Sequence, residues 1–431
     1  MRVRSTLFVV ALVAVCLPAS GDEIHLDAIL SLRGAAADGD PSWLQGGWGK
    51  MYFGGELGEK PGTGKYHLRI GAEETELAAA GSMQFGVDWR PLQRFGVVVN
   101  GVARLEPSEY EGDAIGLSEA FAEGILFFRQ ADRLRLRGGM FFLPTSQENV
   151  GPMWSSPYTI SFSAINSWIG EEVRPVGLDA DYRIEGPTRV SVGATAFVGN
   201  DTMGTLPAWR GWAMHDRLSV YGETLPLAHL WSLEQVFVFQ KDGTTPITND
   251  FDDRIGWSAR IRIERPNVAS VQLTHVDNRG DRARYGDEYS WGTDFNLLGA
   301  HWTPTDRLYL AAEYLDGYTE MGLFVPVEAE FRSAYLLGSW SGDRWRASLR
   351  SDWFDTTDED GDPRGETNEE EGWGWTAAFF WSLTPSLRIG LEVLDVDAEN
   401  VMARQTGYDF QVGGTSATLE VRWNLGRSLR Y

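Results

Sequence analysis

Cysteine is almost absent from this sequence, and its one example, Cys16, lies near the N-terminus. Residues 1–21 combine a basic start, an apolar run from Leu7 to Leu17 and small residues up to Gly21. This pattern predicts a secretory signal peptide that is cleaved after Gly21, whereas the apolar run is too short for a membrane anchor. The exported chain would then contain no cysteine, which excludes disulfide bonds, thiolate catalysis and cysteine-ligated metals.

Lysine is also scarce. The sequence contains four lysines, Lys50, Lys60, Lys65 and Lys241, and the other basic residues are arginines. The 38 basic residues are outnumbered by 61 acidic residues, which gives a formal net charge of -23 at pH 7. Nucleic-acid binding requires a basic surface, so this composition argues against it.

Long apolar runs are missing after residue 21, so the chain has no stretch of about 18 apolar residues that would predict a transmembrane helix. A closed β-barrel can also cross a bilayer, and its sequence signal is much weaker. We find neither a sustained helical period nor a repeat that would indicate a propeller or a solenoid.

Apolar and polar residues instead alternate at a period of two. In the C-terminal stretch 416–431, Leu419, Val421 and Trp423 share one parity, while Glu420 and Arg422 share the other. Successive side chains of a strand point to opposite faces, so this stretch predicts a two-faced strand. The same alternation recurs in 133–142, 189–198, 256–264, 307–315, 345–353 and 387–393.

The connections between these strands alternate between short turns and long polar loops. This arrangement predicts an all-β fold, a transmembrane antiparallel up-and-down barrel of about 18 strands, with 16 as the alternative. A poor strand near 210–222 contributes to the higher count. The barrel is expected over 64–431, and residues 22–63 are interpreted as a periplasmic segment, a partial plug or a first strand. A soluble β-sandwich or propeller is the competing interpretation.

Tryptophans cluster near the predicted strand ends, where a bilayer interface favours amphipathic rings. They include Trp89, Trp231, Trp302, Trp340, Trp345, Trp353, Trp373 and Trp381. Together with the export signal, they predict a protein in contact with outer-membrane lipid of a Gram-negative bacterium. The acidic run 354–372 is interpreted as a solvated outer loop, with cation-bridged contact to lipopolysaccharide as the alternative.

The loop 144–174 is long, rich in aromatic residues and poor in charge runs, which predicts that it folds back into the barrel. Its context, "GGMFFLP" followed by a glutamate, "RPVGLDADY" and "GATAFVGND", is similar to the phosphate-selective porin O and P group. The matching residues are Gly139, Phe141, Pro144, Glu148, Arg174, Gly177 and Gly199.

The resemblance implies a water-filled pore for small solutes, narrowed by this loop, and a possible homotrimer. It does not carry over phosphate selectivity, because that depends on arginine and lysine ladders and lysine is nearly missing. The aromatic end of the last strand, Tyr431, resembles the terminal signature that the barrel-assembly machinery reads, although phenylalanine is commoner there.

The candidate constriction combines a positive wall with a negative loop, and such rings of charge set which solutes pass. The candidate pore-lining residues are Arg133, Arg135, Arg137, Glu148, Trp154, Tyr158, Trp168, Glu171, Glu172 and Arg174. Arg260, Arg262, Arg346 and Arg350 are expected on other lumenal faces. We expect the glutamates to lie across from the row Arg133–Arg137. The alternative is that these arginines only pair with carboxylates and fill space.

The six histidines are dispersed, and no metal-ligand spacing or nucleophile motif is present. The sequence therefore predicts a porin-like channel for passive diffusion of small hydrophilic solutes or ions, without a cofactor or a metal. The preference for anions or cations stays open. The alternatives are a plugged transporter of hydrophobic substrates, a polysaccharide-export barrel and an outer-membrane enzyme.

Overall fold

The computed structural model describes residues 23–54, 75–106, 112–128, 132–323, 327–361, 367–406 and 410–430. The predicted signal peptide with Cys16 and the terminal Tyr431 lie outside the described residues. None of the helices in the described ranges is long and apolar enough to cross a membrane.

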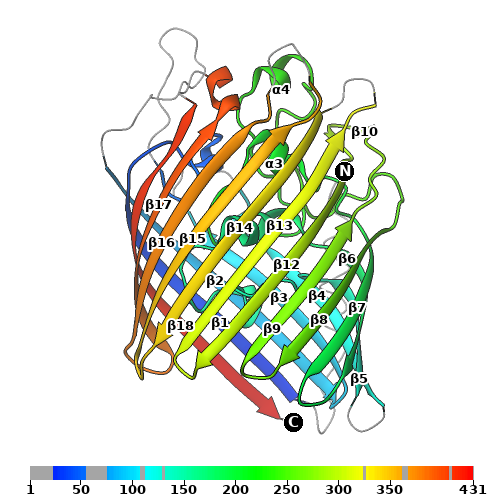
Figure 1. Ribbon diagram of the computed structural model, residues 1–431, viewed down its shortest axis with the longest axis vertical. Helices are drawn as coiled ribbons and strands as arrows, with labels where there is room; N and C mark the ends of the chain where they lie inside the picture. Colours follow the sequence, from blue (N-terminus) through cyan, green and yellow to red (C-terminus); the bar gives the residue numbers. More distant parts are fainter. Residues whose placement is uncertain are drawn as a thin grey trace.

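Sixteen strands of the described chain form one closed antiparallel barrel, in which neighbours in the chain are neighbours in the sheet (Figure 1). The strands are β1 (Glu23–Ala37), β2 (Glu76–Leu92), β3 (Phe95–Leu105), β4 (Ile115–Phe127), β5 (Arg133–Met140), β6 (Val176–Ile184), β7 (Arg189–Val198), β8 (Gly256–Arg265), β9 (Ala269–Asp277), β12 (Gly292–Thr305), β13 (Leu308–Met321), β14 (Val327–Ser341), β15 (Trp345–Asp358), β16 (Glu370–Ser382), β17 (Leu387–Asn400) and β18 (Gln411–Arg430). The pair β10 (Arg284–Tyr285) and β11 (Glu288–Tyr289) forms a separate small hairpin. The barrel closes where β1, over its full length, pairs with residues 416–430 of β18.

The barrel class predicted from the sequence is confirmed, and the strand count is the alternative of 16 rather than 18. The segment 210–222, counted from the sequence as a poor strand, is not a barrel strand and lies inside the lumen, where Met214 makes an isolated bridge to Met51. Residues 23–37 are a full strand of the wall. They match the first-strand interpretation given for residues 22–63, so the barrel begins before the expected boundary at residue 64.

The alternation in β18 separates an outer face from an inner face, as predicted. Leu419, Trp423 and Leu425 are exposed on the outer surface, while Glu420 and Arg422 are buried on the inner face. An outward apolar row and an inward polar row are what a strand between lipid and lumen requires. Trp231 departs from the predicted girdle, because it begins the short helix α4 (Trp231–Gln235) in a loop.

The short turns and the long loops lie at opposite ends of the barrel. The turns β2–β3, β6–β7, β8–β9, β12–β13, β14–β15 and β16–β17 contain two to four residues each. The long connections, which include 38–75, 141–175 and 199–255, leave from the opposite end (Figure 1). Short turns at one rim and long loops at the other are typical of outer-membrane barrels.

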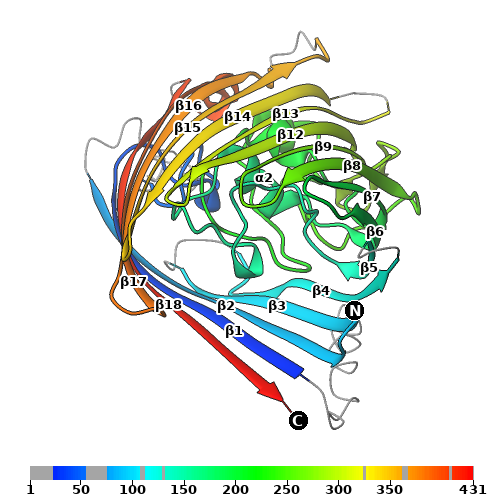
Figure 2. The same ribbon diagram turned by 60° about the horizontal axis from the view of Figure 1, so that its bottom comes forward.

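Three segments enter the barrel and fill much of its interior: 38–54, the 141–175 loop and the 199–255 loop. The 141–175 loop carries α2 (Ala164–Glu172), and the 199–255 loop carries α3 (Thr205–Trp209) and α4. Figure 2 shows α2 and these loops enclosed by the ring of strands. The main hydrophobic core is therefore inside the lumen, where Trp168, Trp209 and Trp212 pack against inward side chains such as Phe295 and Phe331.

Candidate functional site

Helix α2 holds the 141–175 loop inside the barrel. Its N-cap, Ser163, accepts a hydrogen bond from the backbone N–H of Asn166, which satisfies one free donor of the first turn. Every residue of α2 is buried, although the helix comes from a loop. Trp168 packs edge-on against Phe295 of β12 and Phe331 of β14 at centroid distances of 5.2 and 5.1 Å. The loop therefore reaches the wall on the far side from β5 and β6.

Glu148 and Arg350 fasten the loop to β15. The Arg350 guanidinium donates to Glu148 at 2.5 Å and to Asp352 at 2.7 Å, and all three side chains are fully buried. Glu148 also accepts from the backbone N–H of Ser163 at 2.9 Å and from the Asn166 amide at 3.2 Å. A buried ion pair with its remaining lone pairs satisfied fixes one loop position rather than leaving the loop free to move.

The adjacent Glu171 and Glu172 have different surroundings. Glu171 accepts two hydrogen bonds from Arg210, at 2.9 and 2.7 Å, and lies 3.3 Å from the His215 ring. Burial alone would raise the pKa of Glu171, but the charges of Arg210 and His215 outweigh burial and lower the pKa to about 2. Glu171 therefore joins α2 to the 199–255 loop.

The groups that donate hydrogen bonds to Glu172 are neutral. Glu172 accepts from the Trp168 indole N–H at 2.6 Å and from the backbone N–H groups of Gly204 and Leu206 at 3.1 and 3.0 Å. Burial raises the pKa of Glu172 to about 7, and these three hydrogen bonds oppose the rise only in part. This carboxyl group caps the start of α3.

Arg174 is fully buried with backbone carbonyls around it. Its guanidinium donates to the carbonyls of Ser118 and Ser219, both at 2.9 Å, and lies 3.6 Å from the centre of the Phe142 ring. Burial lowers the pKa of Arg174 to about 9. This side chain braces the loop against the wall and has no exposure to a solute.

The two aromatic residues expected at the constriction also pack on neighbours. Trp154 stacks on Phe142 at 4.2 Å and is partly exposed. Tyr158 stacks on Tyr309 at 4.6 Å, and the guanidinium of Arg346 lies 5.0 Å from the Tyr158 ring centre. Met153 and Trp154 have positive φ values of 53° and 58°, a conformation that such residues rarely adopt.

The arginine row on β5 points inward, but the loop glutamates are not its partners. Arg137 pairs with Asp179 at 3.2 Å, and Arg133 lies 3.7 Å from Glu185. Arg135 is directly opposite Asp181 in the register of β5 and β6. The prediction that Glu148, Glu171 and Glu172 lie across from this row is therefore wrong, because these glutamates are buried and bonded to other residues.

Two of the other predicted lumenal arginines, Arg260 and Arg262, contact carboxylates on the wall. Arg260 bridges Asp179 at 2.6 Å and Asp181 at 3.2 Å, and Arg262 lies 3.8 Å from Glu264. The side chain of Arg260 is 3% exposed. Arg260 therefore fits the alternative in which these arginines pair with carboxylates and fill space instead of lining a pore.

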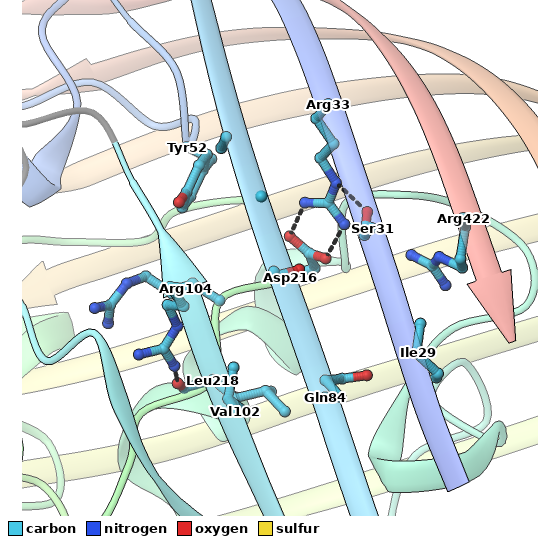
Figure 3. A pocket seen from close by; sticks show the side chains of 14 residues that line it. Ile29, Ser31, Arg33, Tyr52, Gln84, Val102, Arg104, Asp216, Leu218 and Arg422 are labelled. Carbon is cyan, nitrogen blue, oxygen red and sulfur yellow. Dashed lines mark hydrogen bonds and ion pairs between the residues drawn. The ribbon is translucent and has the colours of Figure 1, made fainter. Parts of the chain in front are cut away.

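A row of hollows remains between the lumenal segments and the inner face of β1, and we name it the β1 crevice. Its central hollow lies between β1–β3 and β18 on the wall and residues 216–218 of the 199–255 loop (Figure 3). Ile29 and Arg422 are shared with the hollow on one side, and Arg33, Tyr52 and Asp216 with the hollow on the other. The hollows therefore follow one another along β1.

Basic side chains dominate the central hollow of the β1 crevice. Arg33, Arg104, Arg217 and Arg422 contribute four guanidinium groups, and Asp216 contributes one carboxylate. Figure 3 shows Arg33 reaching across to Asp216, and Arg104 directed at the backbone carbonyl of Leu218. The wall and the 199–255 loop are thus in direct contact across this hollow.

Sequence reasoning missed most of these crevice residues. The polar parity of the last strand contained a signal for Arg422 and Glu420, and Ser31 and Arg33 have the same spacing on β1. The role of Asp216 had no comparable signal, because the segment 210–222 was taken for a strand of the wall.

One acidic group in the loops is compact enough for a cation. Carboxylate oxygens of Asp201, Asp250 and Asp252 lie within 4.8 Å of one another. One Asp201 oxygen already accepts from the backbone N–H groups of Phe251 and Asp252. Burial, opposed by these hydrogen bonds and reinforced by Asp252 and Asp250, raises the pKa of Asp201 to about 6. We assign no metal to this group.

The closed barrel of this chain has the fold of solved outer-membrane channels. The outer-membrane channel DcaP of Acinetobacter baumannii superposes with a TM-score of 0.55 at 11% identity, over 94% of this chain and 98% of that one. OprB of Pseudomonas putida and the anion-selective porin of Comamonas acidovorans each give 0.48 at 10% identity, over 94% of this chain and 94% and 100% of theirs. No protein-family description and no curated protein matches the sequence.

Proposed function

We propose that this protein is a porin-type channel of the bacterial outer membrane, which passes small hydrophilic solutes by passive diffusion. The observation that supports it is the β1 crevice, a row of hollows with arginine side chains in its lining, along a barrel that otherwise contains a packed core. The route differs from the one expected beside the β5 arginine row. No covalent step and no cofactor is part of this proposal.

The lining of the crevice favours anionic solutes. Its central hollow is lined by four arginines and one aspartate, and Glu106, Glu223 and Glu420 pair with these arginines from beside the hollow. A solute with a carboxylate or a phosphate group would meet guanidinium donors there. The homotrimer implied by the resemblance stays a prediction.

Planar-bilayer conductance of the folded, purified protein in a salt gradient tests the proposal. We expect discrete conductance steps and a reversal potential whose sign indicates anion preference. A folded barrel that never conducts would overturn the channel proposal, and a cation-selective potential would overturn the anion preference alone.

The filled lumen favours a second candidate, a plugged transporter. Trp43, Leu44 and Trp48 of the 38–54 segment join the core inside the barrel, as a plug would. This candidate predicts no steady conductance in the wild type, and conductance only after the lumenal segments are loosened. The same bilayer measurement therefore separates the two candidates.

A further inference from the structure

The β1 crevice is wide at one end and almost closed where Asp216 crosses it. The hollow that Arg388 and Arg422 line has a volume of about 250 Å³, whereas the central hollow and the hollow beyond it have about 40 and 20 Å³. Each of the two small hollows has room for only a few water molecules. Asp216 lines both small hollows and does not line the wide one. The narrow part of the crevice is therefore the part that Asp216 borders.

Arg33 offers a complete binding arrangement for a carboxylate, and Asp216 occupies it (Figure 3). Two nitrogens of the guanidinium donate to the two Asp216 oxygens at 2.6 and 2.5 Å. A two-pronged contact of this kind is how arginine recognises carboxylates. Arg33 also donates to Glu420 from Nε at 3.1 Å and from Nη2 at 3.0 Å. Glu420 therefore orients the guanidinium whether or not Asp216 is bound.

The two carboxylates on Arg33 differ in accessibility. The side chain of Glu420 has no exposed surface, and it also accepts from Ser31 at 2.6 Å and from Arg422 at 3.0 Å. The side chain of Asp216 is 19% exposed, and in the described part of the chain its hydrogen bonds come from Arg33. Glu420 is thus a fixed part of the arrangement, and Asp216 is the group that a solute can reach and replace.

The backbone beside Asp216 is held by contacts that do not involve its side chain. The carbonyl of His215 accepts from the N–H of Phe162 at 3.2 Å, and the N–H of His215 donates to the Ser167 hydroxyl at 3.0 Å. Asp216 can therefore turn away from Arg33 while the 199–255 loop stays in place. The exchange costs one ion pair, and an incoming carboxylate makes that pair again.

We propose that Arg33 is a carboxylate-binding residue for solutes, that Asp216 occupies its site at rest, and that a solute carboxylate opens the crevice by displacing Asp216. A carboxylate has the same single charge as Asp216, so the exchange keeps the charge balance beside Glu420. A doubly charged anion such as sulfate would add negative charge close to Glu420, and like charges at such a distance repel. The ligand class is therefore a small solute with one carboxylate group. The inference rests on the proposed function for the crevice as a route, but binding at Arg33 is measurable without conductance.

Equilibrium binding of acetate to the folded protein tests the proposal. Acetate is titrated at constant ionic strength, and saturation transfer from the protein to its methyl protons reports the bound fraction. A competitor that occupies a site about nine-tenths of the time lowers the apparent affinity about tenfold. We therefore expect Asp216→Ala to bind acetate about tenfold more tightly than the wild type. Asp343→Ala removes an exposed turn carboxylate and should bind acetate as the wild type does.

Arg33→Met removes the binding residue, and we expect it to lose saturable acetate binding while circular dichroism shows a folded barrel. Equal affinities of the wild type and Asp216→Ala would overturn the displacement of Asp216, and this arm does not depend on the folding of Arg33→Met. Acetate binding that survives in folded Arg33→Met would overturn the site, and sulfate that competes more strongly than acetate itself would overturn the ligand class. Conductance is recorded separately. Acetate binding without conductance would support the site and overturn the channel alone.

Discussion

Arg33 of β1 and Asp216 of the 199–255 loop form a two-pronged ion pair, with N–O distances of 2.6 and 2.5 Å. The two residues are 183 positions apart in the chain and meet at the border between two hollows of the β1 crevice. Arg33 also donates to Glu420 of β18 at 3.0 Å. The wall, the closing strand and the lumenal loop are thus joined at one point of the proposed solute route.

Replacing Asp216 tests whether this ion pair obstructs the route. In Asp216→Asn, the charged link between wall and loop is lost, while Arg33 keeps Glu420. We expect single-channel conductance to rise and the reversal potential to move further toward anions, because one carboxylate leaves the lining. Asp343→Asn removes an exposed turn carboxylate that pairs with Arg307 at 3.3 Å, and it should change neither quantity. Equal conductance in both variants would place Asp216 outside the route.

The position of the route is tested by comparing two arginines. Arg422→Gln removes a guanidinium from the crevice, and Arg135→Gln removes one from the β5 row. We expect the reversal potential of Arg422→Gln to move toward cations, with little change for Arg135→Gln. The opposite result would assign solute passage to the β5 row, as the sequence pattern suggested.

We expect the ion pairs of Arg350 to contribute strongly to the unfolding free energy of the barrel with its lumenal loops in place. Arg350→Met leaves Glu148 and Asp352 as buried charges without their cation, a loss that typically costs about 3–5 kcal/mol of unfolding free energy. Arg307→Met breaks an exposed pair and should cost about 0–1 kcal/mol. Urea unfolding in detergent micelles or lipid measures both. Similar losses in the two variants would show that the loop is held by its packing alone.

Glu171 makes stability depend on pH at the acidic end. Its folded pKa of about 2 lies below the ordinary value of 4.5, so its contribution is complete above about pH 4.5 and is lost as the pH falls toward 2. The full contribution is about 3 kcal/mol. We expect Glu171→Gln to be less stable than the wild type at pH 7 and equally stable near pH 2.

The measurement is the unfolding free energy from pH 2 to pH 7, with Glu359→Gln, an exposed loop residue, as the matched control. The control should follow the wild-type curve throughout. A Glu171→Gln curve parallel to the wild type over this range would contradict the assigned charge contacts with Arg210 and His215.

The barrel could be predicted because lipid imposes one rule on every strand. Leu419, Val421 and Trp423 had to share a parity, and the pattern is visible without knowing the partners of β18. The error at 210–222 has the same origin. An extended segment that lies between a polar wall and an apolar core also alternates, so periodicity alone does not distinguish a wall strand from a lumenal one.

The candidate site was less predictable, because its contacts join distant parts of the chain. Glu148 was identified from its place in the loop. Its partner Arg350 is 202 residues away, and the sequence did not distinguish Arg350 from the other arginines as the partner. Glu171 and Glu172 were grouped as one negative patch. On a helix, successive residues point about 100° apart, and the two carboxylates accordingly contact different neighbours.

The pairing of β1 with β18 also removes both free edges of the sheet. The strand that begins the wall must find the strand that ends it, across almost the whole chain, and until then both edges of the sheet have free backbone donors and acceptors. The lumenal segments are enclosed by the same step. A chain that lacks β18 would therefore keep two open edges and an uncovered core.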